Sequence, residues 1–213
     1  MLVGPVPAFL GGLSRRVTDV VEELGYVGIA GLIALENVVP PIPSELILPL
    51  AGFMARDGRF SLPVVVAAAT IGSIVGALVL YAAGAWLGDA RLRALVERFG
   101  GMLGVSKRDL DRAHDWFDRY GGVAVFLGRL VPVVRSLVSI PAGLRRMPPG
   151  RFMIYTGAGS LVWNSVLIGL GWTAGDQWHK VEQYVSFFEY AVLAAIAAGV
   201  VAFLWKRRQA KAI

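Results

Sequence analysis

The sequence predicts an all-α, polytopic integral membrane protein. The predicted architecture is an inverted repeat, in which each unit contains a re-entrant helical hairpin and a spanning helix. A C-terminal spanning helix follows the two units. Three observations predict this class: the apolar composition, an internal repeat and the uneven distribution of positive charge. Of 213 residues, 56% are hydrophobic and only 17% are charged, and the mean hydropathy is +0.62. One soluble domain of this size cannot hide so much apolar surface, so lipid must solvate part of it.

The composition also excludes several kinds of chemistry. There is no cysteine, which excludes disulfide scaffolds, thiolate metal sites and cysteine nucleophiles. The net charge of +6 is compatible with nucleic-acid binding, but positive charge beside apolar spans more often faces the cytoplasm and anionic lipid. We therefore expect membrane lipids and no nucleic acid as partners. His114 and His179 are far apart and outside the apolar spans, so neither a metal site nor a cofactor is expected.

The N-terminal segment, 1–24, is too short and too often interrupted by proline and glycine to cross a bilayer. Within it, the pattern of 14–24 predicts an amphipathic helix at the membrane interface. No charged segment precedes the apolar start, which argues against a cleaved signal peptide.

Three uninterrupted apolar stretches, 62–87, 152–174 and 187–205, reach the length of about 20 residues that a spanning helix needs. Two more, 26–54 and 122–144, are interrupted in the middle by proline and ionisable residues. An arm of about ten residues gives about 15 Å of helix, half of a hydrocarbon core of about 30 Å. We therefore expect two re-entrant hairpins with their tips inside the membrane, where protein or trapped water satisfies the broken backbone.

Charged segments flank these spans. The connector 90–119 has Ser106 at the start of a capping-box pattern, and we expect it to be an amphipathic helix on the cytoplasmic membrane surface. The basic tail follows the last span directly, as a cytoplasmic anchor does. The chain is thus interpreted as a single membrane domain, 1–213, with these parts: N-terminal segment 1–24, first repeat 25–89, connector 90–119, second repeat 120–176, C-terminal spanning helix 187–205 and basic tail 206–213.

An internal repeat relates the two hairpin regions. A shift of 87 places 72–89 on 159–176 with eight of 18 positions identical, and a shift of 92 places Pro40 on Pro132. Each unit therefore contains a broken hairpin followed by one spanning helix, and a single crossing per unit inverts the second unit relative to the first. The matched glycines at Gly-x-x-x-Gly spacing, 84–88 and 171–175, either allow close helix packing or are incidental.

The distribution of lysine and arginine supports the same topology. Seven lie in 89–119 and three in 145–151, whereas 174–186 contains one lysine and two acidic residues. The positive-inside rule then places the mouth of the second hairpin and the C-terminus in the cytoplasm. The first hairpin consequently opens to the outside.

Four ionisable residues lie at predicted membrane depth: Glu36 and Glu45 at the first hairpin tip, and Arg129 and Arg135 at the second. Such groups cost roughly 2.5 to 3.5 kcal/mol on insertion scales and are functional by default. If both tips meet near the midplane, two carboxylates face two guanidinium groups there. The alternative is a purely structural pair of salt bridges.

Arginine suits a phosphate, because its planar fork makes two parallel hydrogen bonds and keeps its charge. We therefore expect Arg129 and Arg135 to hold an anionic head group. Ser136 and Ser139 either add hydroxyl groups or bond their own backbone at a helix break. Glu36 and Glu45 are expected to bind at the same site and to take up protons during a transport cycle.

Proline, glycine and one asparagine shape the hairpins and their packing. Asn164 follows the second Gly-Ser in a span, where it bonds either a hairpin tip or a neighbouring helix. The residues assigned to these structural motifs are Pro40, Pro43, Pro49, Gly52, Pro132, Pro141, Gly143 and Asn164.

The stretches 36–52, ENVVPPIPSELILPLAG, and 128–143, GRLVPVVRSLVSIPAG, resemble the paired motifs of the DedA family of bacterial membrane proteins, which shares the VTT or SNARE-associated Golgi protein domain. The resemblance covers roughly 20–180. It implies two re-entrant loops in an inverted repeat and a role in moving lipids between leaflets. Family members need two acidic residues and two arginines, which by position resemble Glu36, Glu45, Arg129 and Arg135.

Bacterial members of that family are associated with returning undecaprenyl phosphate, the carrier lipid of cell-wall synthesis, to the cytoplasmic leaflet. The resemblance therefore implies a transporter of polyprenyl phosphate in the bacterial inner membrane, with no catalytic residues. The alternatives are a less selective phospholipid scramblase, as in eukaryotic relatives, a membrane lipid phosphatase and a scaffold without transport. Whether the chain forms a homo-oligomer is left open.

Overall fold

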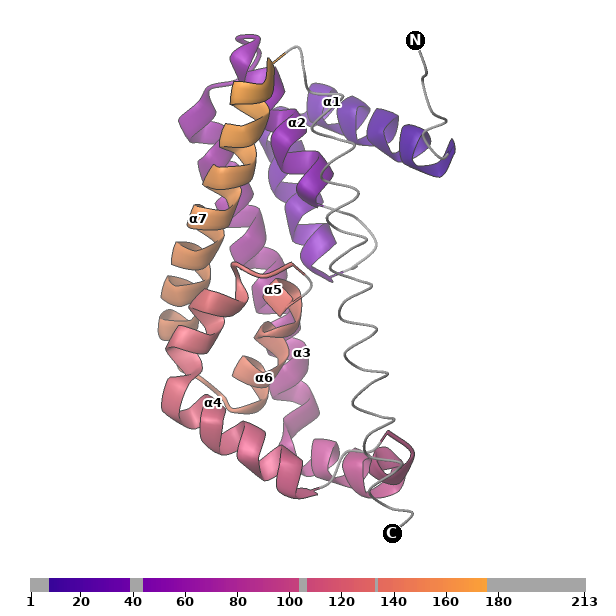
Figure 1. Ribbon diagram of the computed structural model, residues 1–213, viewed down its shortest axis with the longest axis vertical. Coiled ribbons are helices and arrows are strands. Elements are labelled where there is room, and N and C mark those ends of the chain that lie inside the picture. The colour runs from indigo at the N-terminus through magenta and orange to yellow at the C-terminus, as the bar shows by residue number, and fades with distance from the viewer. Residues whose placement is uncertain (1–7, 39–43, 104–106, 133, 176–213) are drawn as a thin grey trace.

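The computed structural model describes residues 8–38, 44–103, 107–132 and 134–175, and this part of the chain is helical apart from turns (Figure 1). The all-α class is thereby confirmed for the described residues. The expected span 187–205, the tail 206–213, Pro40, Pro43 and His179 lie outside them. In chain order the helices are α1 (Ala8–Val38), α2 (Ser44–Arg56), α3 (Leu62–Leu103), α4 (Lys107–Gly128), α5 (Val134–Leu137), α6 (Ser139–Leu144) and α7 (Pro149–Ala174).

Two helices are long and apolar enough to cross a membrane. They are Leu62–Ala94 within α3, of 33 residues and mean hydropathy 2.3, and Pro149–Ala174, of 26 residues and mean hydropathy 1.3. Their most apolar windows are only 33% buried within the protein, so most of this apolar surface faces outward. Outward-facing examples are Ile71 and Ile154, which are 59% and 70% exposed. A surface of this kind fits a lipid environment better than water.

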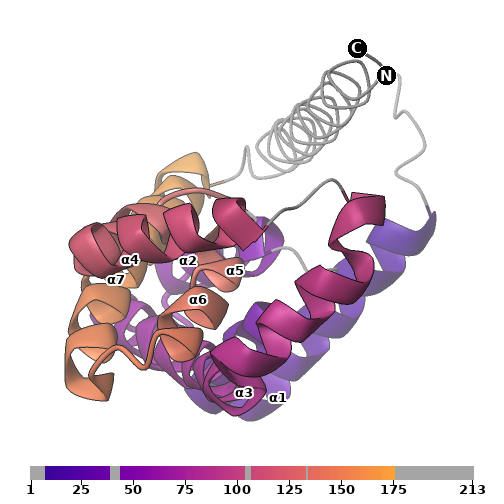
Figure 2. The same ribbon diagram turned by 90° about the horizontal axis from the view of Figure 1, so that it is seen from below.

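Glycines with positive φ interrupt the two longest helices. Gly25 has φ 59° in α1, and Gly88 has φ 68° in α3, a region that glycine occupies without steric cost. Beyond these kinks the first half of α1 and the last part of α3 project from the same side of the bundle, at opposite ends of its long axis (Figures 1 and 2). The bundle thus has a transverse helix near each end.

Some predicted boundaries differ from those in the structure. The N-terminal helix expected at 14–24 begins at Ala8, because Gly11 and Gly12 do not interrupt it, and it reaches the kink at Gly25, where the backbone is not helical. The connector predicted at 90–119 begins close to the kink at Gly88. Its first part is the segment of α3 beyond that kink, and its second part is the start of α4, which runs unbroken from Lys107 to Gly128.

The two hairpins occupy opposite ends of the long axis. The second half of α1 and α2 form the first hairpin, α4, α5 and α6 form the second, and their tips approach each other in the middle (Figure 1). The first break is shorter than the expected 36–45, because Glu36 still lies in α1 and Glu45 already lies in the first turn of α2. The acidic side chains are therefore held by helices and not by a loop.

The second arm of the first hairpin packs directly on α7. A Cβ added at Gly52 in α2 would lie 2.0 Å from the carbonyl oxygen of Ile168, and one added at Gly171 in α7 would lie 1.9 Å from that of Pro49. Real side chains never approach backbone so closely, so only glycine fits at both positions.

The same pair of contacts joins the second hairpin to α3. A Cβ at Gly143 in α6 would lie 1.9 Å from the carbonyl oxygen of Tyr81, and one at Gly84 in α3 would lie 2.3 Å from that of Ile140. Tyr81 and Gly84 are the residues that the shift of 87 places on Ile168 and Gly171. The second arm of the first hairpin, α2, therefore packs on α7, and that of the second hairpin, α6, packs on α3.

A methyl group at the α2–α7 contact should separate these helices. We expect Gly171→Ala to destabilise the protein by about 3 kcal/mol through overpacking. Gly169→Ala is the matched control, because Gly169 lies on the same helix with nothing within 4 Å of the added carbon. Denaturation of the purified protein in detergent checks this, and equal stability of the two variants would contradict the close contact.

Candidate functional site

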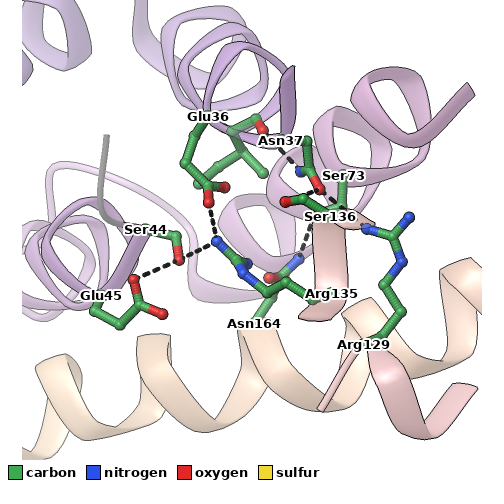
Figure 3. Close-up of polar contacts among 10 residues, drawn as sticks. Glu36, Asn37, Ser44, Glu45, Ser73, Arg129, Arg135, Ser136 and Asn164 are labelled. Carbon is green, nitrogen blue, oxygen red and sulfur yellow. Dashed lines mark hydrogen bonds and ion pairs between the residues drawn. The ribbon is translucent and has the colours of Figure 1, made fainter. Parts of the chain in front are cut away.

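The hairpin tips gather polar side chains at the centre of the bundle (Figure 3). Glu36, Asn37, Arg129 and Arg135 are 5%, 1%, 2% and 5% exposed. The whole cluster draws on helices α1, α2, α5 and α6 and on the turn after α4, so the site exists only when both hairpins are in place. The residues brought together are Glu36 and Asn37 at the end of α1, Ser44 and Glu45 at the start of α2, Arg129 after α4, Arg135 and Ser136 in α5, and Ser139 in α6.

Arg135 forms the buried ion pair of the site. Its Nη2 donates to Glu36 Oε1 and to the hydroxyl of Ser44. The Ser44 hydroxyl in turn donates to Glu45 Oε2 at 3.2 Å, so Glu45 is separated from Arg135 by one hydroxyl group. Of the two carboxylates expected at the guanidinium groups, Glu36 contacts Arg135 directly and Glu45 is linked to it through the Ser44 hydroxyl.

Arg129 is buried without an ion pair to any carboxylate in the described part of the chain. Its Nη1 donates to Asn37 Oδ1 at 3.0 Å and its Nη2 donates to Ser139 Oγ at 2.7 Å, while its Nε has no partner. Gly159 on α7 makes room for it, since a Cβ there would lie 2.7 Å from Arg129 Cβ. The direct hydrogen-bond partners of this guanidinium in the described part of the chain are thus neutral acceptors.

Asn37 was not among the predicted site residues, although it joins the two hairpins. Its Nδ2 donates to the carbonyl oxygen of Ile33 at 2.9 Å, which directs Oδ1 toward the second hairpin. There Oδ1 accepts from Arg129 and, at 3.5 Å, from the Ser136 hydroxyl. The repeat contained a signal for this residue, because the shift of 92 places Asn37 on Arg129.

Asn164 lies between the spanning helices and not on a hairpin tip. Its Nδ2 donates to Thr70 Oγ1 at 3.3 Å and to Ser73 Oγ at 3.4 Å, both on α3. Of the two uses considered for it, the contact between helices is the one present in the structure. It braces α7 against α3 beside the site (Figure 3).

The proline and glycine motif residues that the structure describes lie around the site without donating to it. At the turn after α4, the N–H of Val134 donates to the carbonyl oxygen of Pro132 at 2.7 Å. Pro49 and Gly52 lie within α2, and Pro141 and Gly143 lie within α6, at the close contacts with α7 and α3.

A second, more exposed polar cluster joins α3 to α4. Arg93 bonds Asp89 at 3.0 Å and Asp111 at 2.7 Å, and His114 Nδ1 lies 3.3 Å from Asp89 Oδ1. Nearby, Arg145 pairs with Asp118 and holds the pKa of that carboxyl below its usual range through hydrogen bonding. Among the described residues, no three His, Cys, Asp or Glu side chains come close enough to hold a metal ion.

The described tips bring two guanidinium groups together with the carboxylates of Glu36 and Glu45, and of these groups only Arg135 and Glu36 form a direct ion pair. Arginine forks of this kind bind carboxylates and phosphates through paired hydrogen bonds. The arrangement is therefore suited to holding an anion.

The comparisons with known proteins agree with this description. The chain is 39% identical to an alkaline phosphatase-like protein of Lactococcus lactis subsp. cremoris, covering 92% of this chain and 94% of that protein. It is 35% identical to undecaprenyl phosphate transporter A of Staphylococcus aureus, over 93% of this chain and 100% of that protein. It is also 33% identical to the membrane protein YkoX of Bacillus subtilis, over 89% of this chain and 82% of that protein. No solved structure gives a significant match.

The family model of the VTT domain matches residues 42–173, which include α2, Arg129, Arg135 and nearly all of α7, while Glu36 and Asn37 precede the matched range. With relatives at this level of identity along nearly the whole chain, the protein belongs to the VTT domain family and is a DedA family membrane protein.

Proposed function

We propose that this protein moves undecaprenyl phosphate, a polyprenyl phosphate, between the leaflets of the bacterial inner membrane, with the phosphate bound at Arg129 and Arg135. The observation that carries the proposal is the buried Arg129, which makes no ion pair with a carboxylate in the described part of the chain. The name of the Staphylococcus aureus relative supports the choice of lipid.

Electrostatics favours an anion at this position. A guanidinium removed from water loses several kcal/mol of solvation, which only a well-placed opposite charge recovers in full. Arg129 has the neutral oxygens of Asn37 and Ser139 instead, and Arg135 is occupied by Glu36. A phosphate monoester has about −1.5 to −2 charges at pH 7 and three acceptor oxygens, so it satisfies both guanidinium groups at once.

Glu36 acts in this proposal as the ion that occupies Arg135 while lipid is absent. Phosphate binding to Arg135 displaces it, and protonation of the displaced carboxyl removes its repulsion of the phosphate. Glu45 lies one hydroxyl away, through Ser44, and serves as the second proton acceptor. The isoprenoid tail stays in lipid beside the hairpins.

The membrane arrangement belongs to the same proposal. We infer two re-entrant hairpins in an inverted repeat, with the C-terminus in the cytoplasm. Three features support it: the hairpins lie at opposite ends of the bundle, their tips meet in the middle, and the glycine contacts of α2 on α7 recur between α6 and α3. Such a repeat places a midplane site between two halves that open alternately.

Removal of either arginine should abolish recognition of the phosphate. We expect Arg129→Gln and Arg135→Gln to weaken binding of undecaprenyl phosphate to the purified protein by at least about 30-fold, because a buried charge contact is lost. Binding of the uncharged polyprenol should not change. Arg59→Gln is the control, since Arg59 is 55% exposed and pairs with Glu22 on the surface. Equal binding of phosphate and alcohol by the wild type would contradict the proposal.

A membrane lipid phosphatase is the second candidate, because a relative at 39% identity is named an alkaline phosphatase-like protein. The same purified protein distinguishes the two functions. Release of inorganic phosphate from undecaprenyl phosphate, lost in Arg135→Gln, would favour the phosphatase. Movement of intact lipid between vesicle leaflets favours the transporter, and equal movement of phosphatidylethanolamine would indicate a scramblase.

The Glu36–Arg135 pair should hold the lipid-free protein together. We expect Glu36→Gln to destabilise it by about 3 kcal/mol, because Arg135 is left as an unpaired buried charge. Glu22→Gln removes a surface pair whose side chains are 48% and 55% exposed and should cost less than about 1 kcal/mol. Detergent denaturation of both variants checks this, and similar stabilities would show that the ion pair is not the resting state.

Proton uptake by the acidic residues makes lipid binding depend on pH. Above about pH 7 the phosphate keeps its second charge. In that range we expect wild-type affinity for undecaprenyl phosphate to rise as pH falls, because protonation of Glu36 frees Arg135. Glu36→Gln combined with Glu45→Gln should abolish this dependence, in binding and in leaflet-exchange assays. An unchanged pH profile would refute proton coupling through these residues.

A further inference from the structure

Several buried polar atoms in the described part of the chain have no hydrogen-bond partner. Three of them belong to side chains around the two guanidinium groups: Glu36 Oε2, Arg129 Nε and Trp163 Nε1. The proposed function uses the first two residues but not the tryptophan. An indole N–H donates and cannot accept, so its burial without an acceptor costs free energy that a bound acceptor recovers.

Trp163 lies beside Arg135 on a third structural element. It projects from α7, and its ring centroid lies 6.0 Å from Arg135 Cζ, within the range of a cation–π contact. The ring also packs against the apolar cluster that includes residues of α2 and α7. Packing fixes the ring, so its contact with Arg135 does not depend on the contact of Arg135 with Glu36.

Trp163 occupies a position where the two repeat units differ. The shift of 87 places it on Gly76 of α3. A Cβ at Gly76 would lie 2.4 Å from the carbonyl oxygen of Ala34 and 2.7 Å from Asn37 Cβ, so a glycine there lets α1 pack directly on α3. The second unit instead has an indole at this position, next to the guanidinium. Helix packing that is common to both units does not account for this difference between Gly76 and Trp163.

We propose that Trp163 is a phosphate-recognition residue: its Nε1–H donates to a phosphate oxygen bound by Arg135, and its ring holds the guanidinium when Glu36 is displaced. The inference rests on the proposed function, since the ligand is the same phosphate. It adds a neutral donor from α7 to the charged donors of the second hairpin. The lipid phosphate then contacts a spanning helix as well as a hairpin tip.

Two substitutions separate the N–H from the ring. Trp163→Phe keeps an aromatic ring and removes the donor, and Trp163→Leu removes both. Trp172→Phe makes the same chemical change on the same helix at a residue that is 44% exposed, and it is the matched control. The probe is undecaprenyl phosphate in detergent micelles, with the uncharged polyprenol measured alongside, and thermal unfolding is recorded without lipid.

We expect Trp163→Phe to bind undecaprenyl phosphate about tenfold more weakly, as for loss of one hydrogen bond to a charged group. Trp163→Leu should bind more weakly still. Without lipid, Trp163→Phe should unfold at the wild-type temperature or above, because the unpartnered donor is gone. Weaker binding without loss of stability distinguishes recognition from a packing role. Trp172→Phe should match the wild type in both measurements.

Wild-type affinity in Trp163→Phe, together with lost binding in Arg135→Gln, would overturn the role of Trp163 and leave the proposed function intact. Unchanged binding in both arginine variants would overturn the proposed function and this inference with it. A test without substitution uses the wild type: the indole N–H resonance of Trp163, in ¹⁵N-labelled protein, should move on titration with the phosphate lipid and not with the polyprenol. A stationary resonance would also overturn the inference.

Discussion

The contact between the two hairpin tips is the constraint on which the rest of the structure depends. Glu36 and Asn37 end one hairpin, Arg129 and Arg135 begin the tip of the other, and four buried side chains join them. A buried charge is tolerable only when hydrogen bonds and an opposite charge surround it, so each tip is unstable without the other. The helices that carry the tips must therefore keep a fixed depth and rotation. The close glycine contacts of α2 on α7 and of α6 on α3 provide that positioning.

Within the site the two arginines have different partners, and this difference links structure to function. Arg135 has a carboxylate and a hydroxyl, whereas Arg129 has an amide oxygen and a hydroxyl. Breaking the Glu36–Arg135 pair would leave a buried charge without its partner, whereas Arg129 has no direct ion pair to lose among the described residues. Ser44, Ser139 and Asn37 hold the two guanidinium groups in orientation.

The sequence was sufficient for the helical class and for two helices long and apolar enough to cross a membrane, because apolar length determines these features directly. It was also sufficient to bring Glu36, Arg129 and Arg135 to one place, since charge at apparent membrane depth is rare. Helix ends were predicted less well: α1 begins at Ala8 because Gly11 and Gly12 do not interrupt it, and α4 continues past the predicted end of the connector at 119. Asn37 and Trp163 were not predicted as site residues: they are uncharged, and their significance depends on which groups the fold brings near them. The sequence could not show that Ser44 stands between Glu45 and Arg135, because that depends on side-chain geometry at the start of α2.

The cross-packing of the hairpins has a consequence for how such a chain assembles. Helix α7 supplies the glycine face against which α2 rests, and α3 supplies the one against which α6 rests. Neither half of the chain therefore completes its own helix contacts. Separately synthesised halves are thus complementary pieces and not independent domains.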